Sequence, residues 1–125
     1  MKKEQKAADN PAAFERSSCP ITNVLDLFGD KWTLLVIRDL VLGKRRYQEL
    51  IVSPEKIASN ILADRLKKLE DAGIITRQAY QQKPARYEYR LTQKGEELQP
   101  ILEAIITWGL KYYPGTTIFP RIERY

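Results

Sequence analysis

The strongest constraint on the fold of this chain is the segment of residues 59–72, in which apolar side chains recur at the spacing of an α-helix. The apolar positions lie at i, i+4, i+8 and i+11: Ala58, Leu62, Leu66 and Leu69. They form one narrow stripe, so this helix packs one face and exposes the other. Ser59 is suited to the N-cap, and Gly73 supplies a left-handed C-terminal stop, ending the helix at Ala72.

Immediately after this helix, the sequence changes to the pattern of a β-hairpin. Residues 74–80 and 86–91 are rich in β-branched and aromatic side chains, and residues 81–85 between them contain the turn-forming Pro84. The hairpin is the wing of a winged helix if it follows a helix-turn-helix.

Three helices are predicted upstream. Pro20 fits the first turn of a helix that Gly29 ends, and a wide apolar surface over residues 31–43 predicts a central helix. Two helical turns follow over residues 47–52, before Pro54. This short helix, a turn and the amphipathic helix make a helix-turn-helix. We therefore expect a mainly α fold with a β-hairpin wing, which is a winged helix-turn-helix.

A last helix is predicted from a cap at Thr92 to Tyr113, with Pro100 inside it as the cause of a kink. This helix carries more apolar surface than one face can hide, and the excess predicts a partner chain. The residues expected at that dimer contact are Leu98, Ile101, Leu102, Ile105 and Trp108.

The chain of 125 residues has the length of one domain. We divide it into a flexible N-terminal arm (1–17), the winged helix-turn-helix (18–113) and a C-terminal tail (114–125). The start of the chain lacks the apolar core of a secretory signal, and no apolar run approaches the ~18 residues needed to cross a bilayer. We therefore expect a cytoplasmic protein without membrane contact.

Composition argues against several function classes. The chain has no histidine and one cysteine, which is too few soft ligands for a structural zinc site and leaves no imidazole base for a catalytic triad. An enzyme would have to depend on carboxylates, and Glu49, Asp64 and Glu88 form no obvious convergent pair. We expect no metal, no cofactor and no enzymatic activity.

The charge distribution favours a polyanionic partner. The net charge is +5, and residues 76–95 contain five basic residues against one acidic residue. A basic hairpin beside a helix-turn-helix favours double-stranded DNA. A winged helix used for protein or RNA contacts is the rival interpretation.

The exposed face of residues 59–72 is the expected reading surface in the major groove. The residues on it are Ser59, Asn60, Ala63 and Lys67. Asn60 can pair with adenine, and Lys67 can contact guanine or phosphate. Asp64 argues against DNA binding, because its carboxylate repels phosphates. It can instead accept a hydrogen bond from cytosine or pair with Lys67 or Lys68. An ordinary solvated helix face is the alternative.

Basic residues around this helix are suited to phosphate or minor-groove contacts, although each one alone is equally consistent with a plain surface charge. They are Arg45 and Arg46 before the short helix, and Arg77, Lys83 and Arg86 in the wing. Three hairpin tyrosines have two interpretations. Tyr80, Tyr87 and Tyr89 can stack on bases, as in an RNA binder, or pack against the helices, which their alternate placement favours.

Cys19 also has two interpretations. Beside Pro20 at a helix start, its thiol faces the positive end of the helix dipole, which lowers a thiol pKa and promotes reaction with oxidants or electrophiles. The alternative is a small buried apolar residue near a dimer interface.

A series of short motifs stands in order between residues 19 and 109. The motifs are Cys19-Pro20, Gly29-Asp30-Lys31-Trp32-Thr33-Leu34-Leu35, Leu42-Gly43, Arg46-Tyr47-Gln48-Glu49-Leu50, Ile57-Ala58, Leu62-Ala63-Asp64-Arg65-Leu66-Lys67-Lys68-Leu69, Gly73-Ile74-Ile75-Thr76-Arg77, Tyr87-Glu88-Tyr89-Arg90-Leu91-Thr92, Lys94-Gly95 and Trp108-Gly109. Each motif alone is unspecific, whereas the ordered series is specific. It resembles the HxlR-type family of winged-helix regulators, which is related in fold to the MarR regulators.

This resemblance implies a sequence-specific transcriptional regulator that represses or activates genes. It implies a homodimer, built from the first and last helices, on a pseudo-palindromic operator. The cysteine that matches Cys19 is often the sensor of quinones, aldehydes, hypochlorite or disulfide stress in that family. An oxidant or a small molecule is therefore the expected effector. Some members use a second cysteine, which this chain lacks, so a disulfide of Cys19 must join another subunit or a small thiol.

Overall fold

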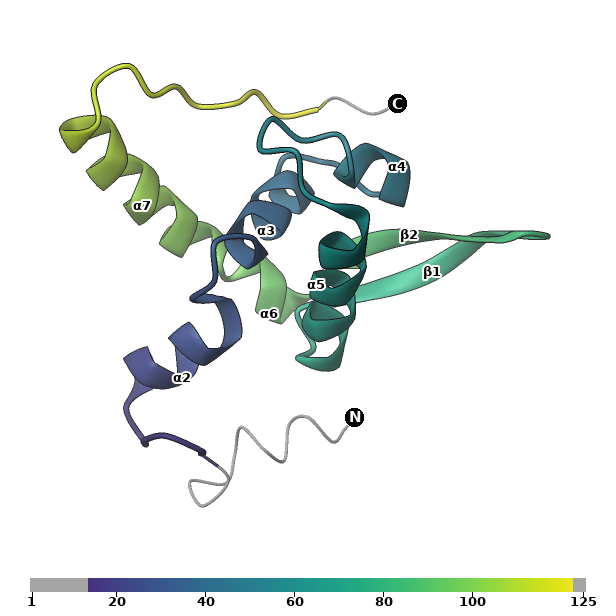
Figure 1. Ribbon diagram of the computed structural model, residues 1–125, viewed down its shortest axis with the longest axis horizontal. Coiled ribbons are helices and arrows are strands. Elements are labelled where there is room, and N and C mark those ends of the chain that lie inside the picture. Colours follow the sequence, from purple (N-terminus) through teal and green to yellow (C-terminus); the bar gives the residue numbers. More distant parts are fainter. Residues whose placement is uncertain (1–13, 123–125) are drawn as a thin grey trace.

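The computed structural model describes residues 14–122, which fold into helices and one antiparallel hairpin (Figure 1). The elements are α2 (Pro20–Phe28), α3 (Thr33–Val41), α4 (Tyr47–Leu50), α5 (Ser59–Asp71), β1 (Ile75–Gln82), β2 (Ala85–Leu91), α6 (Gln93–Glu96) and α7 (Gln99–Tyr112). The hairpin projects from one side of the molecule, and α2 and α7 project from the opposite side. The predicted winged helix-turn-helix is confirmed.

The core lies where α3, α4 and α5 meet the base of the hairpin. The side chains with almost no exposed surface are Ile37, Leu50, Leu62, Leu69, Ile74 and Ile75. They come from each of these elements, so burial of their apolar surface fixes the helix-turn-helix against the wing. The three helices predicted upstream are confirmed.

The amphipathic helix α5 is confirmed, with two corrections at its start. The three leucines of the predicted stripe are buried, but Ala58 is exposed, and Ile57 is buried instead. Ala58 is also the N-cap in place of Ser59, and no side chain caps the helix. Ala58 has extended backbone (φ −72°, ψ 148°), so successive side chains point to opposite sides there. At the other end, Gly73 has φ +76° and stops the helix as predicted.

The wing is longer than predicted. Its strands pair from Ile75 opposite Leu91 to Gln82 opposite Ala85, which reduces the turn to Lys83 and Pro84. Strand pairing needs only backbone groups, so the polar residues near the tip extend the ladder without an apolar core to pack against. At the base of the hairpin Ile75 is buried and Leu91 is half-buried, whereas Gln82, Ala85 and Arg86 at the tip are exposed.

The predicted last helix is two helices, and Pro100 does not kink it. Thr92 caps α6 as expected, with its Oγ1 accepting from the backbone N of Gly95 at 3.2 Å. The helix then ends, and α7 begins with Pro100 in its first turn. A proline ring is tolerated there, whereas in a continuous helix it would clash with the carbonyl four residues earlier, so the break replaces the kink.

The C-terminal segment, residues 114–122, runs back from α7 across the end of α3 (Figure 1). The backbone N of Ile122 donates to the carbonyl O of Leu42 at 2.6 Å, beside Gly43. Of the predicted N-terminal arm, residues 14–17 are described, and the backbone carbonyl of Ser17 accepts from Asn23 of α2. The flexibility predicted for the rest of the arm lies outside the described residues. Within residues 14–122, no helix is long and apolar enough to cross a membrane.

Candidate nucleic-acid interface

The exposed face of α5 carries the four residues predicted to read DNA. Ser59, Asn60, Ala63 and Lys67 are all exposed, opposite the buried leucine stripe. Ala63 and Lys67 also line a groove of about 350 Å³ between α5 and the hairpin, which Arg77 borders from β1. The structure therefore brings part of the helix face and part of the wing together along one groove.

Arg65 holds α5 in place through a residue outside the helix. Its Nε donates to Oδ2 of Asp30 at 2.9 Å. The same carboxylate accepts from the backbone N of Trp32 (3.0 Å) and from the backbone N of Thr33 (3.1 Å) at the start of α3. Partial burial opposes ionisation of Asp30, but the hydrogen bonds from Thr33 and Arg65 outweigh it and hold its pKa well below the usual range.

Two charges on α5 have partners within the helix. The Nζ of Lys67 lies 3.1 Å from Oδ1 of Asp71, although the lysine side chain is 74% exposed. Asp64 pairs with Arg65, which corrects the expectation that it holds a neighbouring lysine. These exposed pairs are weak and break easily. Lys67 can therefore exchange Asp71 for a phosphate at little cost.

Arg46 links the helix-turn-helix to the wing rather than standing free. Its Nε donates to Oε2 of Glu88 on β2 at 3.2 Å, and its guanidinium lies 3.8 Å from the ring centroid of Tyr80 on β1. The hydrogen bond from Arg46 holds the pKa of Glu88 below its usual range. Stacking on an aromatic face stabilises the same arrangement.

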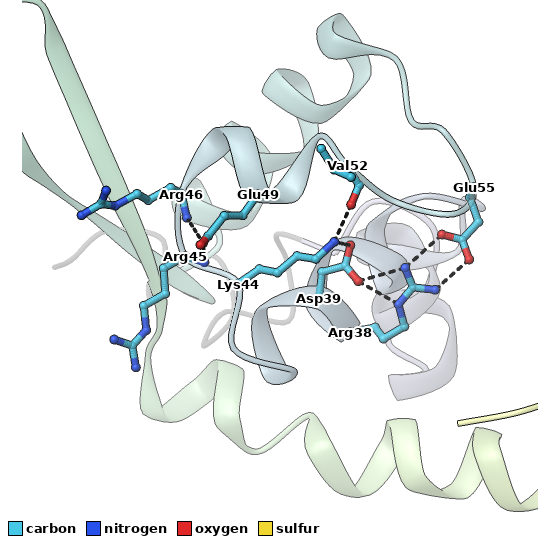
Figure 2. Close-up of polar contacts among 8 residues, drawn as sticks. All are labelled: Arg38, Asp39, Lys44, Arg45, Arg46, Glu49, Val52 and Glu55. Carbon is cyan, nitrogen blue, oxygen red and sulfur yellow. Dashed lines mark hydrogen bonds and ion pairs between the residues drawn. The ribbon is translucent and has the colours of Figure 1, made fainter. Parts of the chain in front are cut away.

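The start of α4 is fixed by Glu49, as Figure 2 shows. Its Oε1 accepts from the backbone N of Arg45 at 2.8 Å and from the backbone N of Arg46 at 3.0 Å. The side chain of Arg45 extends away from this cap. It lines a separate recess of about 390 Å³ with Lys44, Arg90 and Arg121. Arg45 therefore borders a different hollow from the α5 groove.

The basic residues of the wing differ in their surroundings: Arg77 has partners within the chain, whereas those near the tip are exposed. The Nε of Arg77 lies 3.5 Å from Oε2 of Glu70, and its guanidinium lies over the ring of Tyr87 at 4.3 Å. Lys83 and Arg86 lie at or beside the tip and are exposed. The wing thus presents two cations at the part of the hairpin that projects furthest (Figure 1).

The hairpin tyrosines favour packing over base stacking. Tyr89 packs against the hydrophobic core, and burial raises its pKa. Tyr80 and Tyr87 each have a ring face covered by an arginine of this chain. The predicted packing is confirmed for Tyr89, while the other two pack on arginines rather than on helices.

Cys19 is the N-cap residue of α2, and its side chain is exposed in the single chain. The backbone N–H groups of Thr22 and Ile21, at the start of α2, lower the pKa of its thiol. Exposure and a lowered pKa are the two properties of a reactive cysteine. The interpretation of Cys19 as a buried apolar residue would require a partner chain to cover it.

The residues predicted for dimerisation divide into two groups on α7. Leu98 and Leu102 lie against the core of their own chain. Ile101, Ile105 and Trp108 are exposed, with Ile105 at 50% and Trp108 at 59%. The family resemblance implies that the first helix also takes part in the dimer, and α2 does expose three apolar residues that were not among those predicted: Ile21, Val24 and Leu25. Their amphipathic spacing was the available signal.

An ion-pair network beside α4 was not predicted from the sequence. Figure 2 shows Arg38 of α3 donating from Nη1 and Nη2 to Glu55 at 2.8 and 2.9 Å, and from Nε to Asp39 at 3.0 Å. Lys44 donates to the carbonyl O of Val52 at 2.6 Å. No local sequence pattern predicts these contacts, because Arg38 and Glu55 are far apart in sequence. Among residues 14–122, no cluster of three or more potential ligands could hold a metal ion.

Comparison with known proteins identifies the family. A family model described as HxlR-like helix-turn-helix matches residues 27–117. The chain belongs to the HxlR-like helix-turn-helix family. This confirms the resemblance seen in the ordered motifs, and the match extends into the C-terminal segment.

Relatives of this HxlR-like protein are regulators by name. An HTH-type transcriptional regulator of Synechocystis is 44% identical over 91 residues, which cover 73% of this chain and 67% of that protein. The crystal structure of the transcription factor PA1607 is 38% identical with a TM-score of 0.72, over 87% of this chain and 77% of that chain. The reduced form of the redox regulator HypR is 32% identical with a TM-score of 0.70. The match covers 77% of this chain and 95% of the HypR chain. The protein is thus a helix-turn-helix transcriptional regulator.

Proposed function

We propose that this regulator binds a pseudo-palindromic DNA operator as a homodimer and that oxidation or alkylation of Cys19 changes its affinity for that operator. The observation that carries the proposal is the exposed polar face of α5, which lies beside a projecting wing with cations at its tip. This pairing of a helix with a basic hairpin fits one major groove and the adjoining phosphates.

Specific reading is assigned to the start of α5. Asn60 lies in the first turn and is exposed, where an amide can bond the N6 and N7 atoms of adenine. Lys67, about two turns further along α5, and Lys83 at the wing tip supply contacts to phosphates. Arg46 and Arg77 support the interface by fixing the wing, since both are held by carboxylates and tyrosine rings.

The dimer is assigned to α2 and α7. Both helices expose large apolar side chains, including Ile21 at 71% and Trp108 at 59%, on the side of the molecule opposite the wing. Apolar patches of this kind mark interaction sites. A two-fold pair joined there presents two α5 helices, which enter successive major grooves about 34 Å apart.

The regulatory part of the proposal concerns Cys19. Its exposed thiol at the start of α2 has a lowered pKa and lies on a helix assigned to the dimer contact. A change at this sulfur therefore alters the surface that sets the distance between the two α5 helices. The redox regulator HypR, which shares the fold, makes an oxidant a reasonable signal.

Fluorescence anisotropy tests operator binding. A duplex from the region upstream of the regulator's own gene is compared with a scrambled duplex of equal length and composition. We expect at least about 10³-fold tighter binding to the upstream duplex. Asn60→Ala weakens that binding by about 10-fold, at the low end of 1–3 kcal/mol for a bidentate contact. The same substitution leaves the scrambled duplex unaffected.

A matched control is Gln93→Ala, which removes an exposed amide from α6 and leaves both affinities unchanged. Equal affinity for the two duplexes contradicts operator recognition. Competition by single-stranded RNA at the same concentration as the duplex supports the rival RNA interpretation instead.

The proposed switch at Cys19 is tested with an oxidant or an electrophile. Diamide or a quinone releases the wild-type protein from DNA and leaves Cys19→Ser bound. Equal release of both proteins rejects it.

A further inference from the structure

A cavity of about 260 Å³, which is partly open to solvent, lies between α7, the end of α3 and the C-terminal segment. Its apolar walls come from all three parts: Leu42, Ile106, Leu110, Tyr113, Ile118 and Phe119. The segment is anchored beyond the cavity by the hydrogen bond from Ile122 to Leu42 (2.6 Å), so it closes one side. This cavity is separate from the apolar groove on α7 that contains Ile105 and Trp108.

Gly109 enlarges the cavity at its α7 wall. A Cβ built on this residue would meet no atom within 4 Å. Glycine is unfavourable inside a helix, and no close approach within the chain requires it here. The bare backbone therefore leaves space that a side chain at this position would fill.

The charged group on the cavity wall is already paired. Arg38 donates to Glu55 at 2.8 and 2.9 Å and to Asp39 at 3.0 Å, and its guanidinium lies 5.1 Å from the ring centroid of Phe119. An anionic ligand would have to displace these carboxylates. An uncharged ligand leaves them intact and gains contact with apolar walls.

The volume limits the size of the ligand. An apolar cavity of about 150 Å³ accepts benzene, so the larger volume here suits a molecule of one or two rings and is too small for a helix of a partner. We propose that this cavity binds a small uncharged aromatic molecule. This inference deepens the proposed function by locating an effector site, and it rests on that function only for the effect on DNA.

Two side-chain contacts connect the cavity to the loop before α5, the helix proposed to read DNA. Arg38 contacts Phe119 on the cavity side and Glu55 on the other side, and Glu55 lies in the loop that leads into α5 (Figure 2). A molecule packed against Phe119 shifts the Arg38 side chain and, through Glu55, the entry of α5. Ligand binding therefore changes operator affinity.

The test uses 1-naphthylamine, a two-ring aromatic amine that is neutral at pH 7 and whose fluorescence responds to an apolar site, with the full chain. Wild type binds one probe per chain with saturation. Gly109→Leu fills the cavity and weakens binding at least tenfold, while its melting temperature is equal or higher because leucine favours the helix. Phe119→Ala, which removes a wall, also weakens binding.

Thr107→Leu is the matched control, since Thr107 is an exposed residue of α7 that lines neither this cavity nor the groove with Ile105 and Trp108. It retains wild-type probe affinity. Probe binding that survives Gly109→Leu, or is lost in Thr107→Leu, overturns the proposal. The alternative occupant of the cavity is a second copy of this chain, and light scattering tests for it. If Gly109→Leu dissociates the dimer and the control variant does not, the second copy fills this site and the proposal is wrong.

Operator binding separates this inference from the proposed function. With the probe at saturation, the operator affinity of wild type changes severalfold and that of Gly109→Leu does not. Unchanged operator affinity with the probe bound overturns the coupling. A protein that binds probe as described but no operator contradicts the proposed function and leaves the cavity site standing.

Discussion

The Nε of Arg65 on α5 donates to Oδ2 of Asp30, 2.9 Å away, and the same carboxylate accepts two backbone N–H groups at the start of α3. The side chain of Asp30 thus caps the start of α3 and fixes α5 against α3. The orientation of α5 depends on this carboxylate as well as on the leucine stripe.

Asp30→Asn should destabilise the fold. It removes the charge that Arg65 pairs with and weakens the cap, at a cost of about 1–2 kcal/mol in the free energy of unfolding. Urea denaturation at pH 7 measures this. Asp64→Asn is the control, because Asp64 pairs with the same arginine but is 67% exposed, and it should change stability little.

The pH dependence of the same pair has a defined sign. The folded pKa of Asp30 is lowered, so its stabilisation is present above the unfolded-state pKa of about 3.9 and is lost as the pH falls through the folded value. The stability difference between wild type and Asp30→Asn should therefore shrink as the pH is lowered from 5 toward about 2. A difference that is constant with pH would contradict the assignment.

The wing tip should contribute to the salt dependence of DNA binding. Lys83→Ala removes one phosphate contact, so the slope of log K against log salt falls by about 1. Lys111→Ala is the control, since Lys111 lies at the end of α7, on the side opposite the wing. Equal slopes for the two variants would contradict a contact between Lys83 and a DNA phosphate.

Much of the fold could be predicted from periodicity. The leucine stripe of α5, the alternating strands and the glycine stop at Gly73 are local signals, and each corresponds to an observed element. Pro100 was predicted to kink a continuous helix, whereas the structure breaks the helix before it. A proline forbids the helix interior, but the sequence does not say whether a bend or a break resolves the clash.

The site was less predictable than the fold. The exposure of Asn60 and Lys67 followed from the helix pattern. The partners of Arg46 and Arg65 did not, because Glu88 and Asp30 are distant in sequence and come close only in the tertiary structure. Their positions before the short helix and in the wing made Arg46 and Arg77 candidates for DNA contacts, and that stays a prediction, but the sequence did not show that both pair with carboxylates of the same chain.

Ile105→Asp should dissociate the proposed dimer. It places a charge in the exposed apolar face of α7, where burial of an unpaired carboxylate weakens association by about 100-fold or more. Light scattering measures the mass, and circular dichroism checks the fold. Val52→Asp is the control, because Val52 is 71% exposed but lies outside α2 and α7. A dimer that persists in Ile105→Asp would place the interface elsewhere.

The Cys19 thiol should react at lower pH in the folded protein than in urea. Backbone N–H groups at the start of α2 stabilise the thiolate, so the pH midpoint of alkylation by iodoacetamide shifts downward on folding. Thr22→Val removes the hydroxyl that also lowers the pKa of the thiol and should move the midpoint partly back. Equal midpoints in the folded and unfolded states would leave Cys19 an ordinary exposed cysteine.

The spacing of the operator half-sites tests the central claim most directly. Two α5 helices of one dimer reach the same face of the duplex about 34 Å apart, which is one helical turn. Inserting about 5 base pairs between the half-sites turns one of them to the opposite face and should reduce affinity to that of a single half-site. Affinity that is indifferent to this insertion, measured by anisotropy, would contradict a dimer that reads DNA through α5.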